Sequence, residues 1–351
     1  MEDKRNYGID LFRCVSMLMV VILHTLNRGG ALMATEAGSA EDIVGWFLEA
    51  AMYGAVNSYA LVSGYVSWNR RWKPSRIVSV WVQVLFYTVG AAAIFIPLGL
   101  WEATDEALQY SFMPIFSGHY WYITAYIATM VFAPFLNAGI AAVNGREGAS
   151  FAVICAVLFM ILPRATNMSP FGLSGGYSVL WLMVCYVFGG LISRFEVGKN
   201  IPKWVLFIVY ILMTVTAWVC KLRGSAIFMS YISPTMFIGS AALCIMFAKF
   251  DIKNRAAVGV IKLFAPAALG VYIIHVNYFI WRLYIHDYAV GFAGGGVIRF
   301  TALVIGAAFA LYLALSVIEI IRQQLFRLLL INKVISLVDR AVGIESGSVK
   351  K

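Results

Sequence analysis

Long apolar stretches alternate with short polar segments along almost the whole chain. A helix that crosses a bilayer needs about 20 predominantly apolar residues, and several stretches reach this length. The pattern predicts ten membrane-spanning helices, at approximately 9–27, 44–67, 77–99, 119–137, 149–163, 178–193, 203–220, 226–248, 259–283 and 297–320. The fifth and sixth stretches are short for a straight crossing, which indicates thinned, tilted or partly re-entrant segments.

The composition is that of a chain that uses lipid as its solvent. Hydrophobic residues make up 62% of the 351 residues and charged residues 13%, whereas about a quarter of a soluble domain is charged. The mean hydropathy is +0.83. We therefore expect an all-α fold, a polytopic integral membrane bundle of about ten transmembrane helices. One membrane domain is expected over residues 1–321 and a cytoplasmic amphipathic tail over 322–351.

The net charge of +10 is explained by the positive-inside rule, which gathers basic residues in cytoplasmic loops. Nucleic acid is therefore not expected as a partner. With both termini in the cytoplasm, most of the 27 lysines and arginines fall on the inner side. The outer side holds Arg28, Arg164, Lys221, Arg223, Arg282 and Arg299. After the last span, residues 322–340 mix basic and apolar positions, which predicts a helix along the inner membrane surface.

The first apolar stretch carries three ionisable side chains, Asp10, Arg13 and His24. Arg13 and His24 are eleven residues apart, almost three helical turns, so they share one face about 16 Å apart along the axis. Asp10 lies one turn before Arg13 and can pair with it. Two interpretations remain open at this point: a structural ion pair with an interfacial histidine, or a functional site inside the span.

Five segments in the same order resemble a known family. They are Arg13 and His24 with ten residues between them, LVSGYV at 61–66, NRRWKPSR at 69–76, GHYWYI at 118–123 and LGVYIIH at 269–275. Together they resemble the membrane acyltransferase-3 family, whose members acylate sugars and other cell-envelope molecules. The matches extend over nearly the whole chain. The resemblance implies an acyl-coenzyme A donor, most simply acetyl-coenzyme A.

The resemblance gives the charged residues of the first two spans their expected roles. His24 is expected to act as a general base, or to be acylated itself, and a neutral imidazole suits either role. Arg13 is permanently charged and is expected to hold an anionic part of the donor or to pair with Asp10. Arg71 and Arg76 are expected to bind the donor's phosphates. Without the resemblance, ordinary positive-inside anchoring is the better explanation of these loop arginines.

Five further residues are candidates for substrate or supporting contacts, each beside a plainer interpretation. Ser63 can hydrogen-bond substrate, or with Gly64 let helices approach closely. The plainer interpretation of Trp121 is a place in the aromatic belt at the membrane interface, and that of His119 is a place at the outer interface. His275 fits a hydrogen-bonded core histidine. Glu49 is expected to orient the imidazole of His24 from the second span.

We therefore expect a multi-pass enzyme of the bacterial cytoplasmic membrane, with the lipid bilayer and a saccharide acceptor as its partners. It would transfer an acetyl or other short acyl group to a hydroxyl of that saccharide. A transporter or flippase that uses His24 as a proton relay is the alternative. A non-catalytic sensor is a third, although the intact pair of Arg13 and His24 argues against it. The sequence has no Cys/His cluster or HExxH motif, so no metal is expected.

Overall fold

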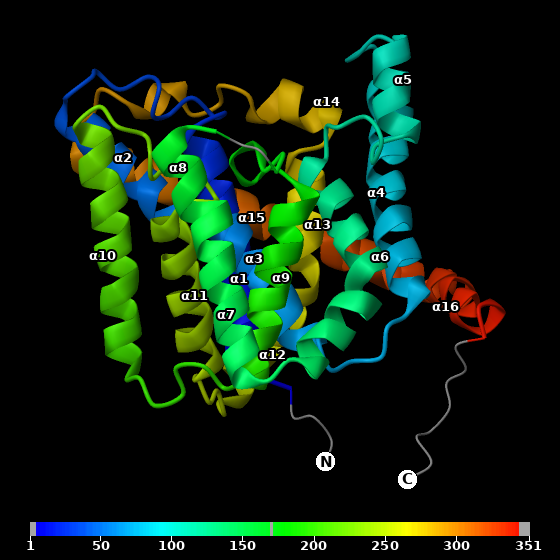
Figure 1. Cartoon of the computed structure of the whole chain (residues 1–351). Coiled ribbons are helices and arrows are strands. Elements are labelled where there is room, and N and C mark those ends of the chain that lie inside the picture. Colours follow the sequence, from blue (N-terminus) through cyan, green and yellow to red (C-terminus); the bar gives the residue numbers. More distant parts are fainter. Residues whose placement is uncertain (1–4, 169–170, 344–351) are drawn as a thin grey trace.

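The computed structural model describes residues 5–168 and 171–343, and these form helices joined by loops (Figure 1). The helices are α1 (Tyr7–Leu26), α2 (Ala40–Met52), α3 (Ala55–Ser67), α4 (Pro74–Phe95), α5 (Asp105–Phe112), α6 (Trp121–Ala142), α7 (Gly145–Cys155), α8 (Leu162–Thr166), α9 (Val179–Arg194), α10 (Lys203–Leu222), α11 (Pro234–Ala248), α12 (Arg255–Phe264), α13 (Ala268–His275), α14 (Tyr278–Ile280), α15 (Val297–Leu328) and α16 (Ile331–Ala341). Several short π and 3-10 turns connect them.

The described residues confirm an all-helical protein with many membrane-spanning helices. Seven helical runs within them are long and apolar enough to cross a bilayer. The helices α9 and α11 are apolar but shorter, with 16 and 15 residues. The predicted span 44–67 is instead two helices of 13 residues, α2 and α3, which meet at Tyr53 and Gly54.

Three predicted boundaries are wrong. The fifth stretch is longer than expected, because α7, a π-helical turn and α8 run from residue 145 to 166. The ninth stretch breaks after His275, where Asn277 caps the short helix α14 with its side chain. The last predicted span, 297–320, continues as α15 to Leu328 and only then turns into α16. The expected tail after residue 343 lies outside the described residues.

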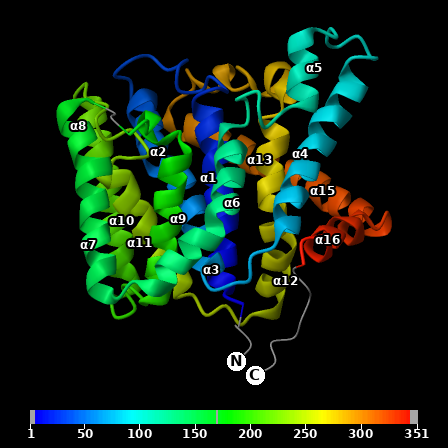
Figure 2. The same ribbon diagram turned by 45° about the vertical axis from the view of Figure 1, so that its right-hand side comes forward.

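The helix α1 is the central element of the bundle. The most apolar part of α1 is 67% buried, compared with 17% for α10 at the periphery. Asn6 caps the start of α1 by accepting a hydrogen bond from the backbone of Ile9, which satisfies one of the free amide groups of the first turn. The helix α1 runs through the height of the molecule (Figures 1 and 2) and packs mainly against α2, α3, α11, α13 and α15.

Two glycines allow α3 and α9 to cross in contact. A Cβ atom on Gly64 would collide with the backbone oxygen of Tyr186, and one on Gly189 would collide with that of Leu61. Only glycine lets the backbones approach so closely. The glycine of the segment LVSGYV is therefore a packing residue, as the plainer interpretation of the sequence predicts.

The bundle has two unlike ends. The starts of α1 and α12 and the loop between α3 and α4 lie at one end, whereas α5, α14 and the start of α2 lie at the other (Figures 1 and 2). The first of these ends carries the basic segment 69–76. In the orientation predicted from the charges, this is the end that faces the cytoplasm.

Candidate active site

A cavity of about 780 Å³ lies inside the bundle, and its lining includes Arg28 and Arg282 from the end that holds α5 and α14. Residues from α1, α2, α3, α6 and α13 and from the loops above them form its walls. Its lining includes Met17, Val20, His24, Asn27, Arg28, Glu49, Tyr53, Tyr59, His119, Trp121, Tyr122, Tyr177, Tyr231, Tyr272, Trp281 and Arg282. Such a concave site with a few convergent polar groups is the usual form of a small-molecule site.

His24 and His275 form a hydrogen-bonded pair at this cavity. The Nδ1 atom of His24 lies 2.6 Å from the Nε2 atom of His275. The Nδ1 atom of His275 in turn lies 2.7 Å from the backbone oxygen of Val271, one turn earlier on α13. The prediction that His275 is a hydrogen-bonded core histidine is therefore incomplete, because its partner is the candidate base itself.

This chain of contacts determines which nitrogen of His24 is free. A carbonyl oxygen only accepts, so Nδ1 of His275 must donate to Val271. The Nε2 atom of a neutral His275 then accepts a hydrogen bond from Nδ1–H of His24. The Nε2 atom of His24 is left unprotonated and makes no hydrogen bond with any described residue. An imidazole held in this tautomer can take a proton from a substrate hydroxyl.

His119 lies at the wall of the same cavity rather than at an outer interface. Its Nε2 atom donates to the backbone oxygen of Val276 at 2.6 Å. Burial lowers the pKa of His119 below its ordinary value of 6.5, and the positive charge of Arg282 adds to this, while the hydrogen bond to Val276 opposes it. His119 thus holds the backbone that directly follows His275 and is neutral near pH 7.

Aromatic rings form one wall of the cavity. Trp121 lies 4.6 Å from Tyr177 and 6.1 Å from Tyr231, measured between ring centroids. Tyr53 lies 5.1 Å from Tyr231, which extends the wall to the end of α2. Trp121 therefore faces the interior, although its place at the start of a span fits an aromatic belt equally well in the sequence.

Glu49 does not orient His24, contrary to the prediction. Its Oε1 atom accepts a hydrogen bond from the side chain of Asn27 at 2.8 Å. The prediction is wrong because His275, from a segment 251 residues away, already occupies the Nδ1 atom of His24. Glu49 still lines the cavity, is only 2% exposed, and its Oε2 atom has no hydrogen-bond partner among the described residues.

The ion pair predicted near the start of α1 is present and has a third member. Arg13 donates to one oxygen of Asp10 at 3.1 Å, and Arg5 donates to the other at 2.5 Å. Asp10 is buried, and the side chain of Arg13 is 30% exposed. Arg13 lies one turn below Met17, the lowest residue of α1 in the cavity wall, and does not itself belong to that wall.

A second, smaller cavity of about 70 Å³ is lined by residues of the basic segment 69–76. Arg70, Lys73 and Arg76 line it together with Ser63, Trp72 and Tyr126. Ser63 donates to the backbone of Tyr59 in its own helix at 2.9 Å. Ser63 and Arg76 are thus brought together here, away from His24, while Arg71 is exposed and does not line this cavity.

Tyrosines separate the two cavities. Tyr122 lines the large cavity and Tyr126 the small one, and their rings stack with centroids 6.1 Å apart. Tyr59 meets Tyr122 edge-on at 6.2 Å. A route between the basic end and His24 would therefore pass through this tyrosine layer.

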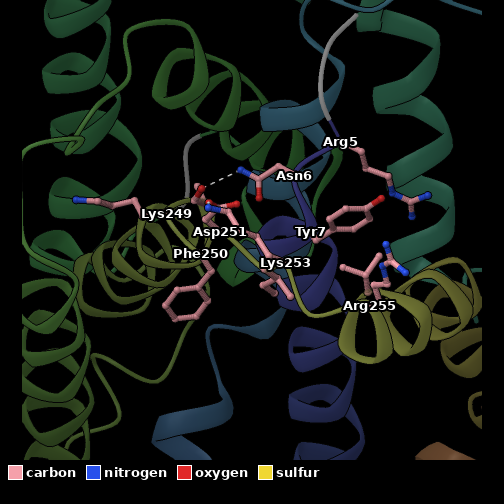
Figure 3. A pocket seen from close by; sticks show the side chains of 11 residues that line it. Arg5, Asn6, Tyr7, Lys249, Phe250, Asp251, Lys253 and Arg255 are labelled. Atoms are coloured by element: carbon pink, nitrogen blue, oxygen red, sulfur yellow. Dashed lines mark hydrogen bonds and ion pairs between the residues drawn. The ribbon is translucent and has the colours of Figure 1, made fainter.

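A third hollow, of about 530 Å³, lies where the chain enters α1 (Figure 3). It is bordered by Arg5, Lys249, Lys253 and Arg255, with Tyr7 and Phe250 between them. Asn6 donates to the backbone oxygen of Ala248 and closes one side (Figure 3). Of the residues predicted as functional, none lines this hollow.

Comparison with known proteins decides the family. The family model for the acyltransferase domain of acyltransferase family 3 matches residues 6–319, which include both members of the histidine pair. The chain belongs to acyltransferase family 3. It is therefore a membrane acyltransferase by family, as the resemblance in the sequence implied. No curated protein and no solved structure matches the chain.

Three parts of this candidate site are not predicted by the sequence. The contact between His24 and His275 joins α1 to α13, and no local spacing encodes it. Asn27 follows the last turn of α1 as an ordinary helix cap. Tyr177 and Tyr231 lie in loops outside the quoted motifs. Only the high aromatic content, 15% of all residues, hints at such a wall.

Proposed function

We propose that this protein is an O-acyltransferase of the bacterial cytoplasmic membrane. It transfers an acetyl or other short acyl group from acyl-coenzyme A to a hydroxyl of a cell-envelope saccharide. The observation that carries this proposal is the pair of His24 and His275, 2.6 Å apart, at the wall of a 780 Å³ cavity in a family-3 chain.

The free Nε2 atom of His24 serves as the general base in this reaction. It takes the proton of the acceptor hydroxyl as the hydroxyl oxygen attacks the thioester carbonyl carbon. The carbon–sulfur bond then breaks, and the coenzyme A thiolate receives the proton from the imidazolium of His24. His275 accepts the hydrogen bond from Nδ1–H throughout and stabilises the imidazolium while it exists.

The donor approaches from the basic end in this proposal. A nucleotide does not fit into a cavity of about 70 Å³, so the phosphates of coenzyme A bind at its mouth, near Arg70, Lys73 and Arg76. The pantetheine arm extends past the stacked rings of Tyr122 and Tyr126 toward His24. Arg13 is charged and partly exposed below the larger cavity, and it attracts the anionic donor. Asp10 holds the side chain of Arg13 in place. Arg71 contributes only a general positive field at this surface.

Label transfer by the purified full-length chain tests the proposal. The protein in detergent is incubated with acetyl-coenzyme A labelled in the acetyl group and with envelope glycan. His24→Ala should lower transfer by about 10²–10⁴-fold, the usual contribution of a general base. His286→Ala is the matched control, since His286 is an exposed histidine outside the cavity. Unchanged transfer in His24→Ala would overturn the role of the base, and a chain that binds no coenzyme A would favour the transporter alternative.

A further inference from the structure

Glu49 and Asn27 form a polar group in the large cavity that the proposed chemistry does not use. Glu49 is 2% exposed, yet only its Oε1 atom has a partner, the side-chain amide of Asn27 at 2.8 Å. Its Oε2 atom is buried and has no hydrogen-bond partner among the described residues. Both residues line the cavity. A buried carboxylate oxygen without a donor is costly, so a donor from a ligand would stabilise it.

The position of this group relative to His24 is fixed by α1. Asn27 lies three residues after His24, which is about 4.5 Å along the helix axis. A group bound to Glu49 and Asn27 is therefore beside the catalytic base, and the offset is comparable with the spacing of hydroxyls on one sugar ring. The two sites can hold different hydroxyls of the same ring.

The aromatic wall supplies the apolar side of the same site. Tyr53 follows Glu49 by one helical turn, and its backbone N–H donates to the Glu49 backbone oxygen at 2.9 Å. Its ring lies 5.1 Å from that of Tyr231, which continues to Trp121. Flat aromatic faces beside a carboxylate and an amide suit a pyranose, which has apolar C–H faces and hydroxyls at its rim.

We propose that Glu49 binds one hydroxyl of the acceptor sugar and thereby determines which neighbouring hydroxyl is acylated at His24. The Oε2 atom of Glu49 accepts the hydrogen bond from that hydroxyl, and Asn27 holds the carboxylate in position. Glu49 is thus a specificity-determining residue of the acceptor site and takes no part in the proton transfer. This inference rests on the proposed acyl transfer.

Matched sugars test the inference on the full chain in detergent. The probes are methyl β-D-glucopyranoside and its four monodeoxy analogues, with acetyl-coenzyme A as donor. We expect one deoxy analogue to raise the wild-type KM about tenfold or more, as expected for a lost hydrogen bond to a charged group. Glu49→Gln should raise the KM for the parent glucoside by a similar factor. In this variant the parent glucoside and that deoxy analogue should have the same KM. Hydrolysis of acetyl-coenzyme A without acceptor should be unchanged.

Two further variants serve as controls. Glu36→Gln removes the same charge from an exposed position in the loop before α2 and should leave the KM for the sugar unchanged. Asn27→Ala leaves the carboxylate in place but frees its second oxygen, so its KM should rise less than that of Glu49→Gln. Equal KM values and an equal response to all analogues in wild type and Glu49→Gln would overturn the inference.

Separate measurements distinguish a failure of the proposed acyl transfer from a failure of the proposed sugar site at Glu49. A wild-type chain that neither hydrolyses nor transfers the acetyl group contradicts the acyltransferase proposal alone. Saturation-transfer NMR with methyl β-D-glucopyranoside then reports sugar binding without any donor. Loss of its signal in Glu49→Gln but not in Glu36→Gln supports the hydroxyl site, and an unchanged signal in both variants overturns it.

Discussion

At the scale of single residues, the catalytic assignment depends on one hydrogen bond between two distant histidines. Because His275 fixes the tautomer of His24, His275→Ala should lower kcat about 10–100-fold, by analogy with the partners that orient metal-bound histidines. The Michaelis constant for acetyl-coenzyme A should change little. His275→Gln, whose amide oxygen can accept from Nδ1–H, should restore part of the rate. The steady-state rate of acetyl transfer in each variant checks this prediction.

A double variant separates positioning from a general loss of structure. If His275 acts only through His24, then His24→Ala with His275→Ala should be no slower than His24→Ala alone. Additive losses would show that His275 contributes to the reaction independently. A wild-type rate in His275→Ala would contradict the orienting role altogether.

His119 gives a prediction about pH. Its pKa in the folded protein lies below the ordinary value of 6.5, so the unfolded chain binds more protons below that pH. The contribution of His119 to stability is therefore complete above about pH 6.5 and is lost as the pH falls through the lower, folded-state pKa. His119→Gln keeps a donor for Val276 but does not titrate. Between about pH 7.5 and about pH 5, thermal unfolding of wild type should shift more than that of the variant; equal shifts would contradict this.

At the scale of helices, the apolar pattern predicts most of the long apolar helices but few of their ends. Apolar length is a local property, so the sequence predicts the spans beginning near Tyr7 and Lys203 almost as the structure has them. Breaks inside apolar runs were missed at Gly54 and at Asn277, because tertiary contacts determine them. The Oγ atom of Ser240 on α11 donates to the backbone oxygen of Gly54, and the side chain of Asn277 donates to that of Tyr87 on α4.

The docking of α16 on α4 is a prediction at the same scale. Asp339 accepts hydrogen bonds from the backbone N–H and the hydroxyl of Ser75, at 2.9 and 2.7 Å, in the first turn of α4. Although partial burial opposes it, these bonds, with Lys73 and Arg76 nearby, lower the pKa of the Asp339 carboxyl. Asp339→Asn should therefore loosen α16 and raise its amide hydrogen exchange about fivefold, as for a lost helix cap. Arg340→Gln, an exposed change on the same helix, should leave the amide hydrogen exchange of α16 unchanged. Equal exchange rates in both variants would contradict the prediction.

At the scale of the whole molecule, family and fold class could be predicted, and the site only in part. His24, His119, Trp121, Glu49 and His275 were all singled out, and all lie at one cavity or its pair of histidines. Their mutual contacts could not be predicted, because they join α1, α2, α6 and α13 across the bundle. Ser63 and Arg76 line a second cavity, because α3 runs from one cavity to the other and Arg76 lies in the first turn of α4.

The two cavities are lined by residues from opposite ends of the bundle, which predicts that donor and acceptor are used from opposite sides of the membrane. Arg28 and Arg282 line the cavity of His24 at one end, whereas Arg70, Lys73 and Arg76 line the small cavity at the other.

In sealed vesicles, acetyl-coenzyme A, which does not cross a bilayer, should be consumed only when added to the side that carries Arg70. The glucoside should be acylated on the other side. Maleimide labelling of Arg71→Cys and Glu36→Cys reports the orientation of each vesicle preparation. Consumption of the donor when it is added to the side of Glu36 would contradict the proposed direction of donor entry. Acylation of sugar on the same side as the donor would show that the acyl group does not cross the layer of Tyr122 and Tyr126.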